Sequence, residues 1–441
     1  RPILIRNTDY TILNGEWEYT FTENSERPVE YGGKILVPFS PECILSGVAR
    51  QLKPEEYLWY RKEILLERWN VKTERRHMLL HFGAVDQCAV VYINGKKQGK
   101  HVGGYLPFSY DITEALKEEK NLLTVKVRDY SETCYYSRGK QKLKNGGMFY
   151  TAQRGIWQTE WIEKVPECYI GHLKITPLYD QSSIMIQMEE EHGIKDIDYE
   201  VTITARKMWP VKASGKTGKP CVIMIPHMRS WSPEDPFLYD LHVRMGEDSV
   251  ESYFAMRKVE VKNDKEGIPR IFLNNEPYFE KGVLDQGYWP DGLYTPPCDE
   301  AMIYDIQKMK DLGFNMIRKH IKIEPQRWYY HCDRIGMLVW QDMINGGGRS
   351  IQTFLLYLPT VLPFVTTEFR DNCYPLFSRT SKTGREWWKR ECRETVHQLY
   401  NAPCVSLWVL FNEGWGQFDA REMTEMVRAL DLTRQIDHAS F

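Results

Sequence analysis

The pattern of apolar and polar positions changes along the chain, and these changes divide it into three parts. Up to about residue 165, short segments such as residues 122–128 alternate apolar and polar side chains, with turn residues between them. Such alternation is typical of strands with one buried face. Asn94-Gly95 stands between two of these segments and predicts a tight hairpin. We therefore expect a β-sandwich over residues 1–165.

A second group of short β-type segments lies in residues 166–262. Residues 184–188 and 199–204 are the clearest strands, and a polar turn follows at 215–220. We expect a smaller antiparallel sandwich of the immunoglobulin type there. No nucleophile stands beside a base in either sandwich. We therefore expect the second sandwich to be only a spacer between the first and third parts.

From residue 263 onward, strand-like and helical segments alternate, which predicts parallel pairing. Helical spacing of apolar residues is clearest over residues 385–400, and a connection of about 40 residues precedes that helix, beyond the usual loop length. The part from 263 to 441 is therefore expected to be a parallel α/β sheet, of the barrel or the open type. Its predicted strands are residues 278–283, 314–318, 337–342 and 405–413.

Polar residues follow three of these predicted strands at their carboxyl ends. Arg318 and His320 follow the second strand, Asp342 ends the third, and Asn412 with Glu413 ends the fourth. Carboxyl ends of parallel strands meet at one edge of the sheet, where such folds hold their active sites. The alternatives are a structural ion pair of Arg318 with Asp342, a His320 ring satisfied in the core, and a Glu413 side chain solvated on a loop.

Composition limits the classes of function. Lysine and arginine number 58 and aspartate and glutamate 60, so no positive field favours nucleic acid or an anionic membrane. No apolar run is long enough to cross a bilayer. The ten cysteines are scattered without metal-binding spacing, and the first residues lack a signal-type apolar core. We expect a cytoplasmic protein of bacterial type that uses no cofactor and no metal.

Several segments resemble signatures of the family 2 glycoside hydrolases, which include β-galactosidases, β-glucuronidases and β-mannosidases. Trp408, followed four residues later by Asn412-Glu413, is similar to the acid/base signature of that family. Residues 314–318 resemble its second barrel strand, and residues 155–157 resemble the closing strand of its sugar-binding domain. The order of the three parts is also similar, so the resemblance covers essentially the whole chain. It implies that residues 263–441 are the N-terminal half of a (β/α)₈ TIM-barrel catalytic domain.

The resemblance implies a retaining β-glycosidase that acts on an oligosaccharide or glycoside. Glu413 would be the catalytic acid/base, and Asn412 would hold the 2-hydroxyl of the sugar. The other substrate-binding residues would be Arg318, Asp342, His320 and Trp415. Two features differ from the family: its usual histidine stands later than His320 does, and the residues around Trp415 match none of its best-known branches.

An eight-stranded barrel takes about 250 residues, and the third part has room for about four strand–helix units. The family's nucleophile, a glutamate on a later strand, is then absent, and we expect this 441-residue form to be truncated and inactive. Unpaired edge strands would favour a homo-oligomer. Two other interpretations remain: a carbohydrate-binding module without chemistry, and an interaction scaffold whose open half-barrel is covered by a partner.

Overall fold

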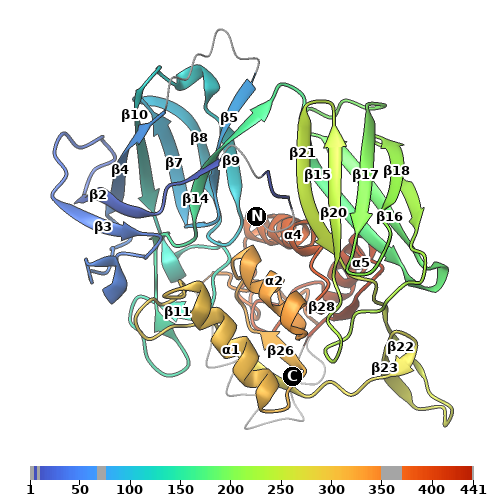
Figure 1. Cartoon of the computed structure of the whole chain (residues 1–441). Coiled ribbons are helices and arrows are strands. Elements are labelled where there is room, and N and C mark those ends of the chain that lie inside the picture. The colour runs from blue at the N-terminus through green and yellow to red at the C-terminus, as the bar shows by residue number, and fades with distance from the viewer. Residues whose placement is uncertain (1–3, 7–9, 67–75, 349–369, 440–441) are drawn as a thin grey trace.

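The computed structural model describes residues 4–6, 10–66, 76–348 and 370–439. Two β-sandwiches lie above an α/β part in the view of Figure 1. This arrangement confirms the predicted fold class of a sandwich, a smaller sandwich and part of a barrel. In the chain, a small sheet of β22–β24 follows the second sandwich and precedes the first barrel strand. The domain limits 1–165, 166–262 and 263–441 stay predictions.

The first sandwich consists of a four-stranded sheet in the order β1-β14-β5-β9 and a six-stranded sheet in the order β3-β2-β4-β10-β7-β8. The predicted hairpin is confirmed, because Asn94 and Gly95 join β7 to β8 with φ of 51° and 84°. The bounds are β1 Tyr10–Ile12, β2 Gly15–Thr22, β3 Gly33–Val37, β4 Tyr57–Leu65, β5 Arg76–Phe82, β7 Cys88–Ile93, β8 Lys96–Val102, β9 Phe108–Asp111, β10 Lys120–Arg128 and β14 Glu160–Pro166.

Two short pairings extend this sandwich toward the barrel. In one of them β11 lies parallel to β12, and in the other β13 lies antiparallel to β6. The bounds are β6 Val85–Asp86, β11 Gln141–Lys142, β12 Tyr150–Thr151 and β13 Gly155–Ile156. Single 3-10 turns are η1 Ile44–Ser46, η2 Thr113–Ala115, η3 Ser131–Thr133 and η4 Tyr179–Gln181.

The second sandwich has sheets in the orders β15-β16-β19 and β18-β17-β20-β21. Their alternating apolar residues face one another in a single core. The bounds are β15 Ile170–Leu178, β16 Ser183–Glu190, β17 Asp198–Thr204, β18 Val211–Lys216, β19 Cys221–Met224, β20 Tyr239–Met245 and β21 Asp248–Phe254, followed by β22 Val259–Asn263, β23 Pro269–Leu273 and β24 Glu276–Pro277.

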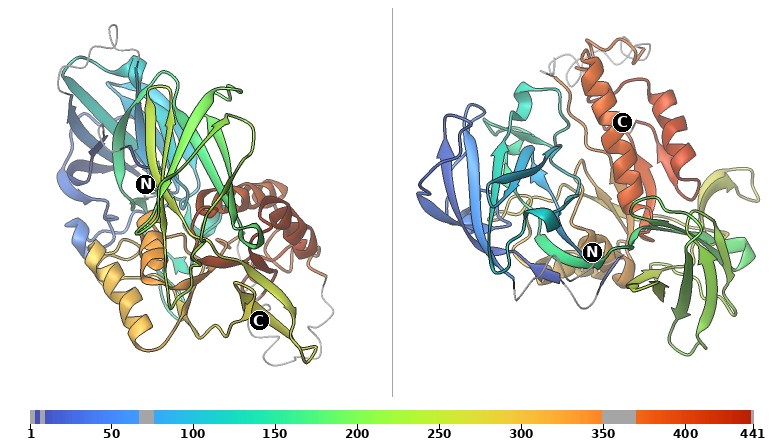
Figure 2. Two further views of the ribbon diagram at one scale, coloured as in Figure 1. Left: turned by 45° about the vertical axis from the view of Figure 1, so that its right-hand side comes forward. Right: turned by 90° about the horizontal axis from the view of Figure 1, so that it is seen from above.

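The α/β part is a sheet of five parallel strands in sequence order, which is the order of a barrel wall. Its helices pack on one face of the sheet, and α4 and α5 lie side by side (Figure 2). The strands are β25 Gly282–Asp285, β26 Met316–Lys319, β27 Leu338–Asp342, β28 Val405–Val409 and β29 Gln435–Asp437. The helices are α1 Asp299–Asp311, α2 Gln326–Ile335, α4 Lys382–Leu399 and α5 Ala420–Leu430.

Two expectations for this sheet need correction. The first strand begins at Gly282 rather than residue 278, because the Tyr278 amide donates to Ile271 O at 2.9 Å and continues the preceding small sheet. The fourth strand ends at Val409 rather than residue 413, and the short fifth strand follows after α5. Of the long connection before α4, residues 349–369 lie outside the described residues.

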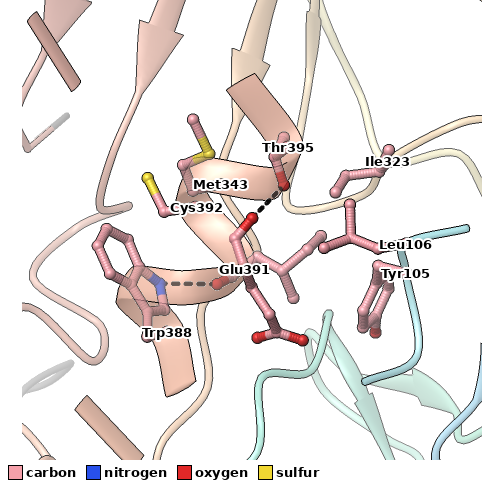
Figure 3. Close-up of a pocket in the computed structure, with 9 residues that line it drawn as sticks. Tyr105, Leu106, Ile323, Met343, Trp388, Glu391, Cys392 and Thr395 are labelled. Carbon is pink, nitrogen blue, oxygen red and sulfur yellow. Dashed lines mark hydrogen bonds between the residues drawn. The ribbon is translucent and has the colours of Figure 1, made fainter. Parts of the chain in front are cut away.

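The first sandwich shares its core with the barrel part. Tyr105 and Leu106 of the sandwich, together with Ile323 and Met343 of the barrel, line an enclosed cavity of about 10 Å³ under helix α4 (Figure 3). Trp388 of α4 also lines it and donates from Nε1 to Ile344 O at 2.9 Å. A cavity of this size has room for about one water molecule, so the sandwich and the barrel are closely packed.

The second sandwich is attached to the base of the sheet. Arg257 follows its last strand and donates from Nε to Pro403 O at 2.9 Å and from Nη2 to Val405 O at 2.8 Å. Because Pro403 and Val405 flank the start of β28, these bonds fix the entry of that strand. Over the described part of the chain, no helix is long and apolar enough to span a membrane.

Candidate functional site

Arg318, Asp342 and His320 meet at the carboxyl ends of β26 and β27. Arg318 donates from Nε to Asp342 Oδ1 at 2.8 Å and from Nη2 to Asp342 Oδ2 at 3.0 Å. His320 Nδ1 lies 2.9 Å from Asp342 Oδ2. The Asp342 side chain is 1% exposed, so the carboxylate would act on a ligand indirectly, by orienting Arg318 and His320. The fork geometry fixes the guanidinium plane.

Asn412 joins this group from the segment that follows β28, three residues after the end of that strand. Its Oδ1 accepts a hydrogen bond from Arg318 Nη2 at 3.0 Å, and the residue is buried. The side-chain NH₂ group of Asn412 takes no part in this bond and can donate to another acceptor. Three predicted site residues, Arg318, Asp342 and Asn412, are therefore in direct contact, as convergence of the strand ends predicts.

Glu413 does not end the strand as expected. The strand ends at Val409, and Glu413 lies on the following loop with φ of 50° and an exposed side chain. The apolar run continues past Val409 because Phe411 stacks on Trp388 of α4 at 4.7 Å between ring centroids. Side-chain packing therefore prolongs the hydrophobic pattern beyond the last residue of the strand.

His320 and Trp415 are both buried at this edge. His320 Nε2 has no hydrogen-bond partner among the described residues, so only one of the two ring nitrogens is paired there. Trp415 is 9% exposed, its ring meets the edge of Phe149 at 6.2 Å, and its Nε1 has no hydrogen-bond partner in the described part of the chain. Trp415 packs within the loop and against the first sandwich, while its indole donor is left over.

The opposite side of β26 carries charges that the sequence pattern did not single out. Lys319 is 1% exposed and donates to Asp285 Oδ2 at 2.6 Å and to Glu324 Oε1 at 2.8 Å. These carboxylates raise the pKa of Lys319 against the lowering effect of burial. Since neighbouring strand residues face opposite sides, Arg318 faces the inner side and Lys319 faces the helices, where it lies 4.2 Å from the Trp328 ring.

Lys140 is a further residue that sequence reasoning missed. It belongs to the first sandwich, and its ammonium group interacts electrostatically with Glu413, Asp342 and Arg318. Burial is the largest cause that lowers its pKa. Sequence periodicity does not relate a sandwich loop to a barrel strand more than 170 residues away, so no signal in the sequence identifies this approach.

Two other places in the described residues were compared with this site. A cleft of about 570 Å³ between the two sandwiches and the barrel is lined by Trp161, His172 and His397 among others, and by none of the six predicted site residues. In the part of the chain that the structure describes, no group of three or more histidine, cysteine or acidic side chains could hold a metal ion. The strand ends therefore remain the candidate site.

A polar cluster at the carboxyl ends of parallel barrel strands, behind two sandwiches, defines the class of multidomain proteins with a barrel-type catalytic domain. Three models of one family match the chain in the same order. They are the sugar binding domain of the glycosyl hydrolases family 2 over residues 44–154, a central domain over 168–257, and its TIM barrel domain over 298–440. The chain belongs to the glycosyl hydrolases of family 2.

Relatives of known name agree with this membership. A beta-galactosidase of Thermoanaerobacter pseudethanolicus is 24% identical over 98% of this chain and 55% of its own length. A beta-galactosidase of Lactococcus lactis is 24% identical over 97% of this chain and 39% of its own length. A beta-D-glucuronidase of Dictyoglomus thermophilum has the same fold, with a TM-score of 0.76, 20% identity and coverage of 99% of this chain and 73% of its own. The chain spans about a third to a half of the length of the curated relatives it matches.

Proposed function

We propose that this chain carries the acid/base half of a retaining β-glycosidase site. The observation that supports the proposal is the contact of Arg318, Asp342 and Asn412 at neighbouring strand ends, directly before Glu413. The names of the relatives, beta-galactosidase and beta-glucuronidase, agree with a glycoside substrate. The sugar is left to experiment.

The proposed chemistry proceeds in two steps. Glu413 donates its proton to the glycosidic oxygen while a second carboxylate attacks the anomeric carbon, and the bond to the leaving group breaks. Glu413 then takes a proton from water, which attacks the anomeric carbon and releases the sugar with its original configuration. Asn412 would donate from its side-chain amide to the 2-hydroxyl, and Arg318 would hold that amide in place.

The second carboxylate must lie about 5–5.5 Å from Glu413 in such a mechanism. Asp342, a strand-end carboxylate among the described residues, is already held by Arg318 and His320. We infer that the nucleophile comes from barrel strands outside these 441 residues, and that a polypeptide limited to them does not hydrolyse glycosides.

The test uses the native protein that contains this sequence, assayed with nitrophenyl β-D-galactoside, β-D-glucuronide and β-D-mannoside. We expect turnover of one of them, with the first product anomer observed by NMR in the β configuration. Glu413→Gln is expected to lower kcat about 100-fold or more. Glu386→Gln, on the exposed side of α4, is the matched control and should be unaffected. A product formed first as the α anomer, or full activity in Glu413→Gln, would contradict the proposal.

A further inference from the structure

A segment of the first sandwich is held across the carboxyl ends of the barrel strands. Arg138 donates from its backbone amide to Asn345 O at 3.0 Å and from Nη1 to Gly347 O at 2.6 Å. Both acceptors lie in the loop directly after β27, the strand that ends in Asp342. Arg138 is itself buried. The backbone beside Lys140 is thus fixed to the rim of the candidate site.

A second set of contacts fixes the other side of the same segment. The Gly139 amide donates to Tyr105 Oη at 2.7 Å, and Lys140 O accepts from the Tyr150 amide at 2.8 Å. The Tyr150 ring stacks on Tyr288, which follows β25, with 3.8 Å between ring centroids. The segment of Lys140 is therefore tied to the loops that follow β25 and β27, and the charge of Lys140 interacts with that of Glu413.

The position leaves little room for the segment to move. A Cβ atom at Gly139 would lie 1.9 Å from Tyr294 Oη and 3.1 Å from Ile321 O, the carbonyl next to His320. The backbone thus passes close to the Tyr294 hydroxyl and the Ile321 carbonyl, and a side chain at Gly139 would collide with the former. The Lys140 side chain is presented to the site from a rigid base.

The ammonium group of Lys140 is half-buried and meets no acceptor among the residues that the structure describes. No hydrogen bond or ion pair joins its Nζ to any residue that the structure describes, although its charge interacts with those of Glu413, Asp342 and Arg318. An ammonium group has three donors, and withdrawing it from water without an acceptor costs free energy. Arg318, by comparison, already donates to Asp342 and Asn412.

We propose that Lys140 is a substrate-binding residue, supplied by the first sandwich, which donates a hydrogen bond to an oxygen of the saccharide bound beside Glu413. This inference rests on the proposed function of the site and adds a contact from a second domain. The acceptor is a hydroxyl or a carboxylate oxygen of the sugar, since an ammonium donor binds either. The first sandwich would thereby take part in choosing the sugar.

Calorimetric titration of the native protein that contains this sequence, with methyl β-D-galactoside and with D-glucuronate, tests this contact. We expect Lys140→Met to weaken binding about tenfold or more, because the lost hydrogen bond is made by a charged donor, and Lys140→Arg to retain part of the affinity. Weaker binding of both ligands to Lys140→Met identifies a hydroxyl acceptor, and weaker binding of D-glucuronate alone identifies a carboxylate acceptor. Lys144→Met, on the exposed continuation of the same segment, is the matched control and should bind as the unaltered protein does.

The outcomes separate this inference from the proposed function. If the unaltered protein and Lys140→Met bind with equal affinity while Arg318→Met has lost binding, Lys140 is not a binding residue and the site itself stands. If the unaltered protein shows no saturable binding of either ligand, both proposals are overturned. Equal melting temperatures of Lys140→Met and Lys144→Met will show that any loss of affinity is not a loss of folding.

Discussion

At the scale of single residues, Asp342 holds the candidate site together. Its carboxylate accepts two hydrogen bonds from Arg318 and lies within hydrogen-bond distance of His320. Through Arg318 it also fixes the amide of Asn412. A buried carboxylate with these partners has two roles, since it orients the groups that would bind a sugar and compensates the charge of the guanidinium.

Asp342→Ala is expected to lower the free energy of unfolding by about 3 kcal/mol, because it leaves the Arg318 charge without its partner. Urea unfolding followed by circular dichroism measures this change. The control is Asp240→Ala, at an exposed position of β20, which should change stability by less than about 0.5 kcal/mol. Equal midpoints for both variants would show that the ion pair contributes nothing.

A buried carboxyl under the site gives a dependence on pH. Burial raises the pKa of Glu391 on α4 from its ordinary 4.5 to about 7, and the Ser137 and Trp387 side chains oppose this only in part. Between these two pH values the folded protein holds a proton that the unfolded chain has released. The contribution of Glu391 to the free energy of unfolding therefore falls as the pH rises through this window and is constant above it.

Glu391→Gln removes this ionisation, so we expect the variant to be more stable than the unaltered protein at pH 8, by about 1–3 kcal/mol. The difference should shrink as the pH falls toward 4.5. Thermal unfolding at several pH values measures it, with Glu386→Gln on the exposed side of the same helix as control. A difference that does not vary with pH would refute the assignment to Glu391.

The residues that the sequence revealed are those whose positions follow from strand ends. Arg318, Asp342 and Asn412 come together because three parallel strands end at one edge, a rule that can be applied to the sequence alone. Glu413 was placed less well, since Phe411 packs on a helix and extends the apolar run past the strand. Lys140 could not be found, because its place depends on how one domain docks on another.

At the scale of elements, the approach of the 137–142 segment to the strand ends is the feature that links the first sandwich to the site. Gly139 contacts both Tyr294 and the Ile321 carbonyl too closely to accept a side chain. The neighbouring strand β11 pairs with β12, which leads back to the closing strands of the sandwich. Sequence patterns did not predict these strands, since pairings of two residues produce no periodicity.

Gly139→Ala is expected to destabilise the protein by about 1–3 kcal/mol through overpacking and to displace the Lys140 backbone from the rim. Chemical unfolding measures the first effect, and proteolysis of the 137–142 segment under native conditions measures the second. Gly32→Ala is the control, because a Cβ atom there would have no neighbour within 4 Å. Equal stability and equal cleavage in the two variants would contradict the described packing.

At the scale of the whole molecule, the described chain shows a five-stranded parallel wall whose edges are β25 and β29. The edge strands present unpaired backbone groups, which favour association with another chain. We expect the 441-residue polypeptide to self-associate, with a sedimentation coefficient that increases with concentration. A single monomer species across the micromolar range would argue that the inner face and edges are covered within the chain itself.

The central claim is that Glu413 gives its proton to the leaving oxygen of a bound glycoside, and leaving-group dependence tests it most directly. In the native protein, kcat/KM of Glu413→Gln relative to the unaltered enzyme is measured on a nitrophenyl glycoside and on an alkyl glycoside of the same sugar. Because an alkoxide needs protonation far more than a nitrophenolate does, we predict a loss at least tenfold larger for the alkyl glycoside. An equal loss on both substrates would contradict the role of Glu413 as the acid.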